Sequence, residues 1–221
     1  MKINPKIVQV PPLYLQVYDG IREEILTGRI EANGQINEVQ LAKQLNVSRG
    51  PIREAVGKLE QEGLLIRKNK SLYVYKTSKE DLQEIYACRI ALESLAVKLT
   101  TKNLSEDAIA ELNEVFREKE RLLKVQSVEN ISDRFTKECS KFHEIILRES
   151  GNERLYQQTN QLRNLTRFYR NSKLRIAEIR KNMYEQHLGI FEAMKAGKGE
   201  EAAILMKEHM ESDLTFLLEN F

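Results

Sequence analysis

Proline is confined to the beginning of this chain, and that distribution limits the possible folds more than any other feature. The four prolines are Pro5, Pro11, Pro12 and Pro51, and residues 52–221 contain no proline. Proline disrupts a helix interior because it lacks an amide hydrogen and clashes with the preceding turn. The proline-free part is rich in Leu, Ile, Glu, Lys, Arg and Ala at helical spacing, so we predict an all-helical domain over residues 78–221.

Residues 1–77 have shorter apolar stretches with clear breaks between them. The spacing predicts a helix that ends at Gly28, a short helix over 41–47, and a third helix that begins at Ser48 and ends at Gly63. The Ser48 hydroxyl is expected to cap the third helix, and the runs 64–66 and 72–75 predict a small β-hairpin. Three helices followed by a hairpin are the order of a winged helix-turn-helix.

The charges divide at the same boundary. The 221 residues carry 35 Lys and Arg against 33 Asp and Glu, a net charge of +2. Residues 1–77 hold 12 basic and 8 acidic residues, or +4, which leaves −2 for residues 78–221. The excess basic residues fall at the start of the third helix and at the hairpin tip, where they can approach a phosphate backbone.

Two features point to a cytoplasmic protein. No apolar run approaches the ~20 residues of a membrane-spanning helix, and the N-terminus lacks the pattern of a signal peptide, so no membrane association is expected. Cys88 and Cys139 are separated by 51 residues and are predicted to be thiols.

Three runs in the first part, 25–30, 36–56 and 59–65, resemble the DNA-binding domain of GntR-type transcriptional regulators. The run 81–97 is similar to the opening helix of the FCD effector domain of the FadR-like subgroup. The resemblance implies a mainly α fold, with a winged helix-turn-helix DNA-binding domain over residues 1–77. It also implies a C-terminal helical bundle over 78–221 for effector binding and dimerisation.

The resemblance also implies which residues contact double-stranded DNA. The helix at Ser48 enters the major groove, with Ser48 and Gly50 against phosphate and Arg49 and Arg53 against bases and phosphates. Arginine can bond guanine O6 and N7 together, and a spacing of four places both arginines on one helical face. Lys68, Asn69 and Lys70 form the wing tip. The alternative is a solvated helix face on which Arg53 pairs with Glu54 or Glu60.

All three histidines, His143, His187 and His209, lie on predicted helices of the second part. Their placement resembles the metal-binding branch of the FCD family, except that Cys139 stands where the family has an aspartate. Cys139 is either a fourth ligand, one turn before His143, or a small buried apolar residue. A thiolate favours zinc over manganese or magnesium. The resemblance thus implies a divalent metal.

A metal with an open position suits a small carboxylate, and the resemblance implies an organic or sugar acid as effector. Arg89, Arg163 and Arg167 are candidates for the countercharge, although each also suits an interhelical salt bridge. We expect a homodimeric transcriptional regulator and not an enzyme. The alternatives are a metal-free regulator that senses a fatty-acid-like ligand and a metal-dependent hydrolase with a DNA-binding module. Leu92, Leu95, Ala96 and Leu99 are expected to pack into the core.

Overall fold

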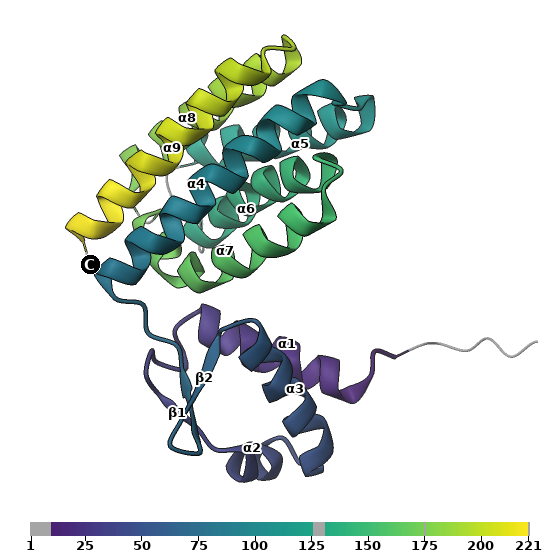
Figure 1. Ribbon diagram of the computed structural model, residues 1–221, viewed down its shortest axis with the longest axis vertical. Coiled ribbons are helices and arrows are strands. Elements are labelled where there is room, and N and C mark those ends of the chain that lie inside the picture. The colour runs from purple at the N-terminus through teal and green to yellow at the C-terminus, as the bar shows by residue number, and fades with distance from the viewer. Residues whose placement is uncertain (1–9, 126–130, 175, 221) are drawn as a thin grey trace, which may run out of the picture. The chain divides into compact units, whose positions relative to one another are not determined.

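The computed structural model describes residues 10–125, 131–174 and 176–220, and within these it leaves out the side chains of residues 167–173. The chain forms two compact units, Met1–Lys76 and Thr77–Phe221. Helices dominate both units, and a small antiparallel sheet occurs in the first (Figure 1). The predicted fold class, a winged helix-turn-helix and a helical bundle, is therefore confirmed.

The described residues of the first unit, 10–76, form three helices and three short strands. They are α1 (Leu13–Leu26), β1 (Gln35–Ile36), α2 (Glu38–Gln44), α3 (Arg49–Gln61), β2 (Leu65–Lys68) and β3 (Ser71–Val74). The strand order is β1-β3-β2, and both pairings are antiparallel. The sequence predicted β2 and β3 but missed β1, whose two residues are too short to show an alternating pattern.

The apolar faces of α1 and α3 form the core of this unit. Val17, Ile21 and Ile25 of α1 are buried, as are Ile52 and Leu59 of α3. This packing leaves the N-terminal end of α3 exposed to solvent. Ser48 occupies the N-cap position of α3, but its side chain makes no capping hydrogen bond, so that expectation was wrong.

The hairpin between β2 and β3 closes in a two-residue turn. Lys68 pairs with Ser71, and the two intervening residues, Asn69 and Lys70, have φ angles of 48° and 67°. Two consecutive left-handed residues are typical of a type I′ turn, whose twist matches that of the strands. Asn tolerates this conformation well, whereas Lys does so at a cost in stability.

The second unit is a bundle of long helices. Its helices are α4 (Lys79–Lys102), α5 (Glu106–Lys124), α6 (Ile131–Glu149), α7 (Glu153–Lys173), α8 (Ala177–Lys195) and α9 (Gly199–Glu219). Helix α4 packs against α9 on one side and against α6 and α7 on another (Figure 1). The Ser78 hydroxyl accepts a hydrogen bond from the Asp81 amide and caps α4.

The expected core face of α4 is confirmed for Ala96, which is buried, and for Leu92 and Leu99, which pack against the core. Leu95 is 43% exposed, and the prediction that it packs into the core was wrong. The buried positions include Tyr86, Arg89, Glu93 and Ala96, so two charged residues occupy core positions of the helix. The spacing of apolar residues did not reveal Arg89 and Glu93, because a prediction based on apolar residues places charged side chains at the surface.

Over the described part of the chain, no helix is both long and apolar enough to cross a membrane.

Candidate metal centre and nucleic-acid interface

Three helices of the second unit bring all three histidines together. His143 on α6, His187 on α8 and His209 on α9 are each at most 4% exposed. Each offers a ring nitrogen, and these three atoms lie within 4.8 Å of one another. The Nε2 atoms of His187 and His209 are 3.2 Å apart. Residues separated by up to 66 positions in the sequence therefore meet at one buried point.

This geometry fits a small divalent cation. Zinc binds histidine nitrogen at about 2.0–2.1 Å, so two nitrogens at a tetrahedral angle lie about 3.3 Å apart. The 3.2 Å separation of His187 and His209 is close to that value. Three imidazoles form the donor set of a zinc site that retains one open position.

The second ring nitrogen of each histidine has its own partner. Nδ1 of His143 lies 2.6 Å from Oε2 of Glu93, and Nδ1 of His209 lies 2.8 Å from Oε1 of Gln186. Nδ1 of His187 lies 2.6 Å from Nζ of Lys119. Such contacts fix ring orientation and determine which nitrogen is available to a metal. Here they direct the Nε2 side of the rings toward the shared space.

Glu93 joins His143 to a buried arginine. Its Oε1 accepts hydrogen bonds from Nε and Nη2 of Arg89, at 2.9 and 2.7 Å, and both side chains are fully buried. Burial opposes ionisation of Glu93, but Arg89 and then His143 hold the pKa of the carboxyl well below its usual range. Burial lowers the pKa of His143 to about 4. His143 is therefore neutral at neutral pH, as a metal ligand must be.

Lys119 is fully buried among aromatic rings. Its Nζ lies 5.2 Å from the ring centre of Phe142 and 5.3 Å from that of Phe116. Burial lowers its pKa, whereas the nearby Cys139 opposes that change. In the tautomer that carries its hydrogen on Nδ1, beside Nζ of Lys119, His187 leaves Nε2 free to bind a metal.

A cavity of about 20 Å³ adjoins the histidines. Its lining includes His143, His209, Arg89, Cys139 and Asp213. This volume is enough for about one water molecule. Cys139 is thus close to the centre, but the group with converging ligand atoms contains the three histidines without Cys139. The cavity therefore admits a single ligand atom or small group beside the histidines.

The three candidate arginines have different surroundings. Arg89 lines the cavity and pairs with Glu93, whereas Arg163 is buried and donates to the Ser140 carbonyl oxygen at 3.1 Å. The side chain of Arg167 lies outside the described residues.

Sequence reasoning missed Glu93, Lys119, Gln186 and Asp213. The signal for Glu93 was present, since it follows Arg89 by four residues and both interrupt the apolar face of α4. Lys119 gave a similar signal, because it shares one face of α5 with the buried residues Leu112, Val115 and Leu122.

In the first unit, the candidate DNA-binding residues lie at two exposed places. Ser48, Arg49, Gly50 and Arg53 are exposed at the start of α3, and Lys68, Asn69 and Lys70 at the hairpin tip. Among the residues that the structure describes, Arg49, Arg53, Lys68 and Lys70 have no ion-pair partner.

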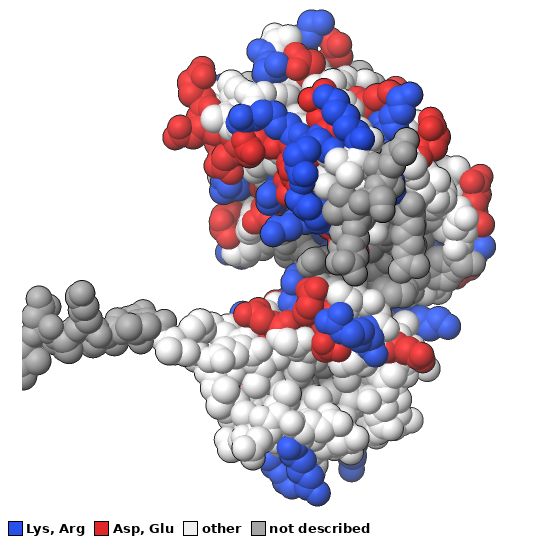
Figure 2. All heavy atoms as spheres, turned by 180° about the vertical axis from the view of Figure 1, so that it is seen from behind, with Lys and Arg blue, Asp and Glu red and all other residues white. Residues whose placement is uncertain are grey.

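Arg67 behaves differently from these four, because its Nη2 lies 2.9 Å from Oε2 of Glu60. The face of this unit seen in Figure 2 is largely uncharged, with Lys and Arg alone at its lower edge. Unpaired cations at a helix start and a hairpin tip can neutralise DNA phosphates.

Comparisons with known proteins agree with both units. The family described as bacterial regulatory proteins, gntR family, matches residues 13–72, and the FCD domain matches residues 84–212. The chain is 32% identical over 206 residues to the HTH-type transcriptional regulator YdhC of Bacillus subtilis, covering 93% of this chain and 89% of that protein.

A second relative and a solved structure extend the comparison. The Nta operon transcriptional regulator of Aminobacter aminovorans is 31% identical over 186 residues, which cover 84% of this chain and 85% of that protein. The structure of E. coli McbR/YncC superposes with a TM-score of 0.79 at 24% identity, covering 96% of this chain and 99% of that one. The chain therefore belongs to the GntR family of DNA-binding transcriptional regulators and carries an FCD effector domain at its C-terminal end.

Proposed function

We propose that this regulator binds a specific operator through residues 1–77 and that a small carboxylate bound through a metal in residues 78–221 changes its operator affinity. The convergence of three buried histidine nitrogens within 4.8 Å carries the proposal. Histidines 143, 187 and 209 hold a divalent metal, and the choice of zinc follows from their three nitrogen donors.

The fourth position of the metal is where the effector acts. When bound, the metal supplies a positive charge that attracts a carboxylate oxygen. Arg89 contributes to the same cavity, although Glu93 already balances much of its charge. Cys139 lines the cavity and is the protein group that competes for this position. A cavity of about 20 Å³ admits only the carboxylate end of an effector, so the remainder of the molecule lies outside this cavity.

The homodimer is part of the proposal, and two exposed apolar residues support it. Helices α4 and α9 are antiparallel, since Lys98 pairs with Glu200 and Tyr86 with Asp213. This register places Leu95 level with Ile204, which are 43% and 57% exposed. A second copy that covers them would provide the two recognition helices that a pseudo-palindromic operator requires.

At the operator, α3 enters the major groove and its exposed arginines read base edges. Arg49 and Arg53 lie on one face of α3, and the wing lysines contact the flanking phosphates. An effector changes this binding only through different affinities for two arrangements of the dimer.

The test combines metal analysis with operator binding. An operator is first selected from a random DNA pool with the full-length protein, and its affinity is measured by fluorescence anisotropy. We expect about one zinc per chain, its loss in His187→Ala, and a change in operator affinity when gluconate is added to zinc-loaded protein.

Cys139→Ala resolves the fourth position in the same experiment. If the thiol is a ligand, this variant binds zinc more weakly, and if it is only apolar packing, zinc affinity is unchanged. Preparations that never contain stoichiometric metal would refute the metal-dependent mechanism.

A further inference from the structure

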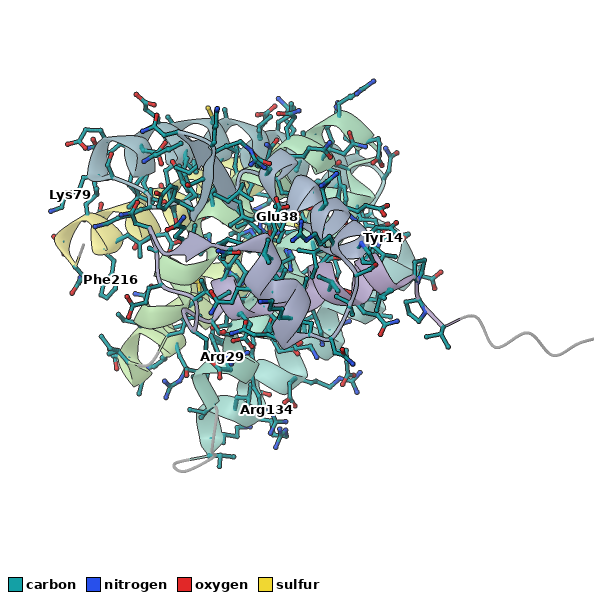
Figure 3. The ribbon with its side chains drawn as sticks, turned by 90° about the horizontal axis from the view of Figure 1, so that it is seen from below. Tyr14, Arg29, Glu38, Lys79, Arg134 and Phe216 are labelled. Carbon is teal, nitrogen blue, oxygen red and sulfur yellow. The ribbon has the colours of Figure 1, made fainter. Side chains whose placement is uncertain are left out.

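A second, larger pocket lies between α8 and α9. It has a volume of about 200 Å³ and opens to the surface of the bundle. Glu178, Asn182, Met183 and Gln186 of α8 line it, together with Asp213 and Phe216 of α9. Phe216 lies at the edge of the unit in the view of Figure 3.

This outer pocket shares walls with the cavity beside the histidines. Met183 and Asp213 line both spaces. Gln186 also links them, because its Oε1 lies 2.8 Å from Nδ1 of His209 while its side chain faces the outer pocket. The two spaces are therefore neighbours, separated by the side chains of Met183 and Asp213.

The charged side chains that line the outer pocket are acidic. Glu178 and Asp213 supply two carboxylates, and no Lys or Arg is among the described residues of its lining. Asp213 is buried and accepts a hydrogen bond from the Tyr86 hydroxyl at 2.5 Å, whereas Glu178 is exposed and has no ion-pair partner in the described chain. A second anionic group is disfavoured here, because like charges repel and lose their hydration.

The remaining lining suits a cation. The amide oxygen of Asn182 accepts hydrogen bonds from an ammonium group, and the face of Phe216 attracts positive charge. The inner cavity differs because the proposed metal adjoins it and adds a positive charge to Arg89, which Glu93 balances, and to Asp213, which lines both spaces. With a metal bound, the two neighbouring spaces are complementary to a molecule with a negative end and a positive end.

We propose that the effector is an amino acid or a related amino carboxylate, with its carboxylate in the inner cavity and its ammonium group in the outer pocket. This inference rests on the proposed effector site and names the chemical class that the site selects. Glu178 determines the specificity, since it faces the ammonium group without touching the histidines. Simple dicarboxylic acids bind poorly, because their second carboxylate meets Glu178.

The experiment uses zinc-loaded full-length protein and matched pairs of ligands. A panel of the standard amino acids, 4-aminobutyrate and 5-aminovalerate is compared with the corresponding acids that lack the amine, first by thermal shift and then by calorimetry. At least one amino acid should bind about tenfold more tightly than its amine-free analogue, as two charge-assisted contacts allow.

Glu178→Gln supplies the decisive variant. Because Glu178 is exposed, the substitution should preserve the fold while reducing the preference for the amine several-fold and leaving the amine-free analogue unchanged. Glu185→Gln, an exposed residue of the same helix outside the pocket, serves as the control and should have no effect.

Two outcomes would overturn the inference. The first is that no amino carboxylate in the panel binds, or that amine-free acids bind equally well. The second is that Glu178→Gln leaves the preference unchanged. If simple acids bind the zinc-loaded protein and alter operator affinity, the proposed function stands while this inference fails. If no acid binds and no metal is present, both fail.

Discussion

The buried pair of Arg89 and Glu93 gives the sharpest test of the metal centre. Glu93→Gln removes the negative charge that accepts two hydrogen bonds from Arg89, at 2.7 and 2.9 Å. Arg89 is 0% exposed, so its charge cannot be rehydrated without disrupting the bundle. Its further contacts include Thr166, the sulfur of Met210 and the ring of Tyr86, none of which supplies a full negative charge. Removing one partner of a buried ion pair costs about 3–5 kcal/mol, and we expect this loss of stability.

Glu93→Gln weakens the contact between residue 93 and Nδ1 of His143 but does not remove it. A glutamine oxygen can still accept the Nδ1 hydrogen of His143, but without the negative charge that makes the imidazole a better ligand. Loss of such a partner lowers metal affinity about 10–100-fold, and the retained acceptor places our expectation near about tenfold. Stability and metal binding therefore change for two separate reasons.

The double variant Arg89→Met, Glu93→Gln separates these two effects. It removes both charges, so the cost of an unpaired buried arginine disappears and most of the stability should return. Zinc affinity should stay about tenfold reduced, because residue 93 remains uncharged.

Stability is measured by urea denaturation of the metal-free protein, followed by helical circular dichroism. Zinc affinity is measured by competition with a chromogenic chelator. The reasoning fails if Glu93→Gln costs less than about 1 kcal/mol, or if the double variant is no more stable than the single one.

Three further predictions concern both units. Arg53→Ala should weaken operator binding by about 1–3 kcal/mol in fluorescence anisotropy, whereas loss of only a solvated side chain would leave binding unchanged. Lys70→Gly should raise unfolding stability by about 0.5–1 kcal/mol, because it relieves a φ of 67°, and should lower the slope of log affinity against log salt by about 0.9. Lys70→Asn tolerates the turn and should lower the slope equally. Chelation of zinc should remove about 2.7 kcal/mol of stability if free zinc was at 100 times its dissociation constant, and His209→Ala should abolish this difference in a thermal melt.

Much of the fold followed from local sequence patterns. The winged helix-turn-helix followed from short apolar stripes with Gly28 and Gly63 at the helix ends, because glycine readily adopts the positive φ that ends a helix. The hairpin followed from its two β-type runs. The two-residue strand β1 was not predictable, because it forms only by pairing with β3.

Local sequence patterns do not predict the buried polar network of Arg89, Glu93 and Lys119. Leu95 was expected inside and is exposed, whereas the charged residues Arg89, Glu93 and Lys119 are buried. Periodicity assigns a side chain to the interior by its polarity, but a charged group can be buried when a distant partner satisfies it. Lys119 meets His187 across 68 positions of sequence, a contact that no local pattern records.

The sequence by itself determined that three histidines lie on three helices and that basic residues gather at a helix start and a hairpin tip. Helical propensity and charge are local properties, and each residue carries them wherever the chain folds. Only the tertiary structure decided that the histidine nitrogens lie within 4.8 Å of one another and that Glu93, Lys119 and Gln186 orient them. Those distances depend on how α4, α5, α6, α8 and α9 pack, because side-chain volume and burial across the whole bundle set the packing.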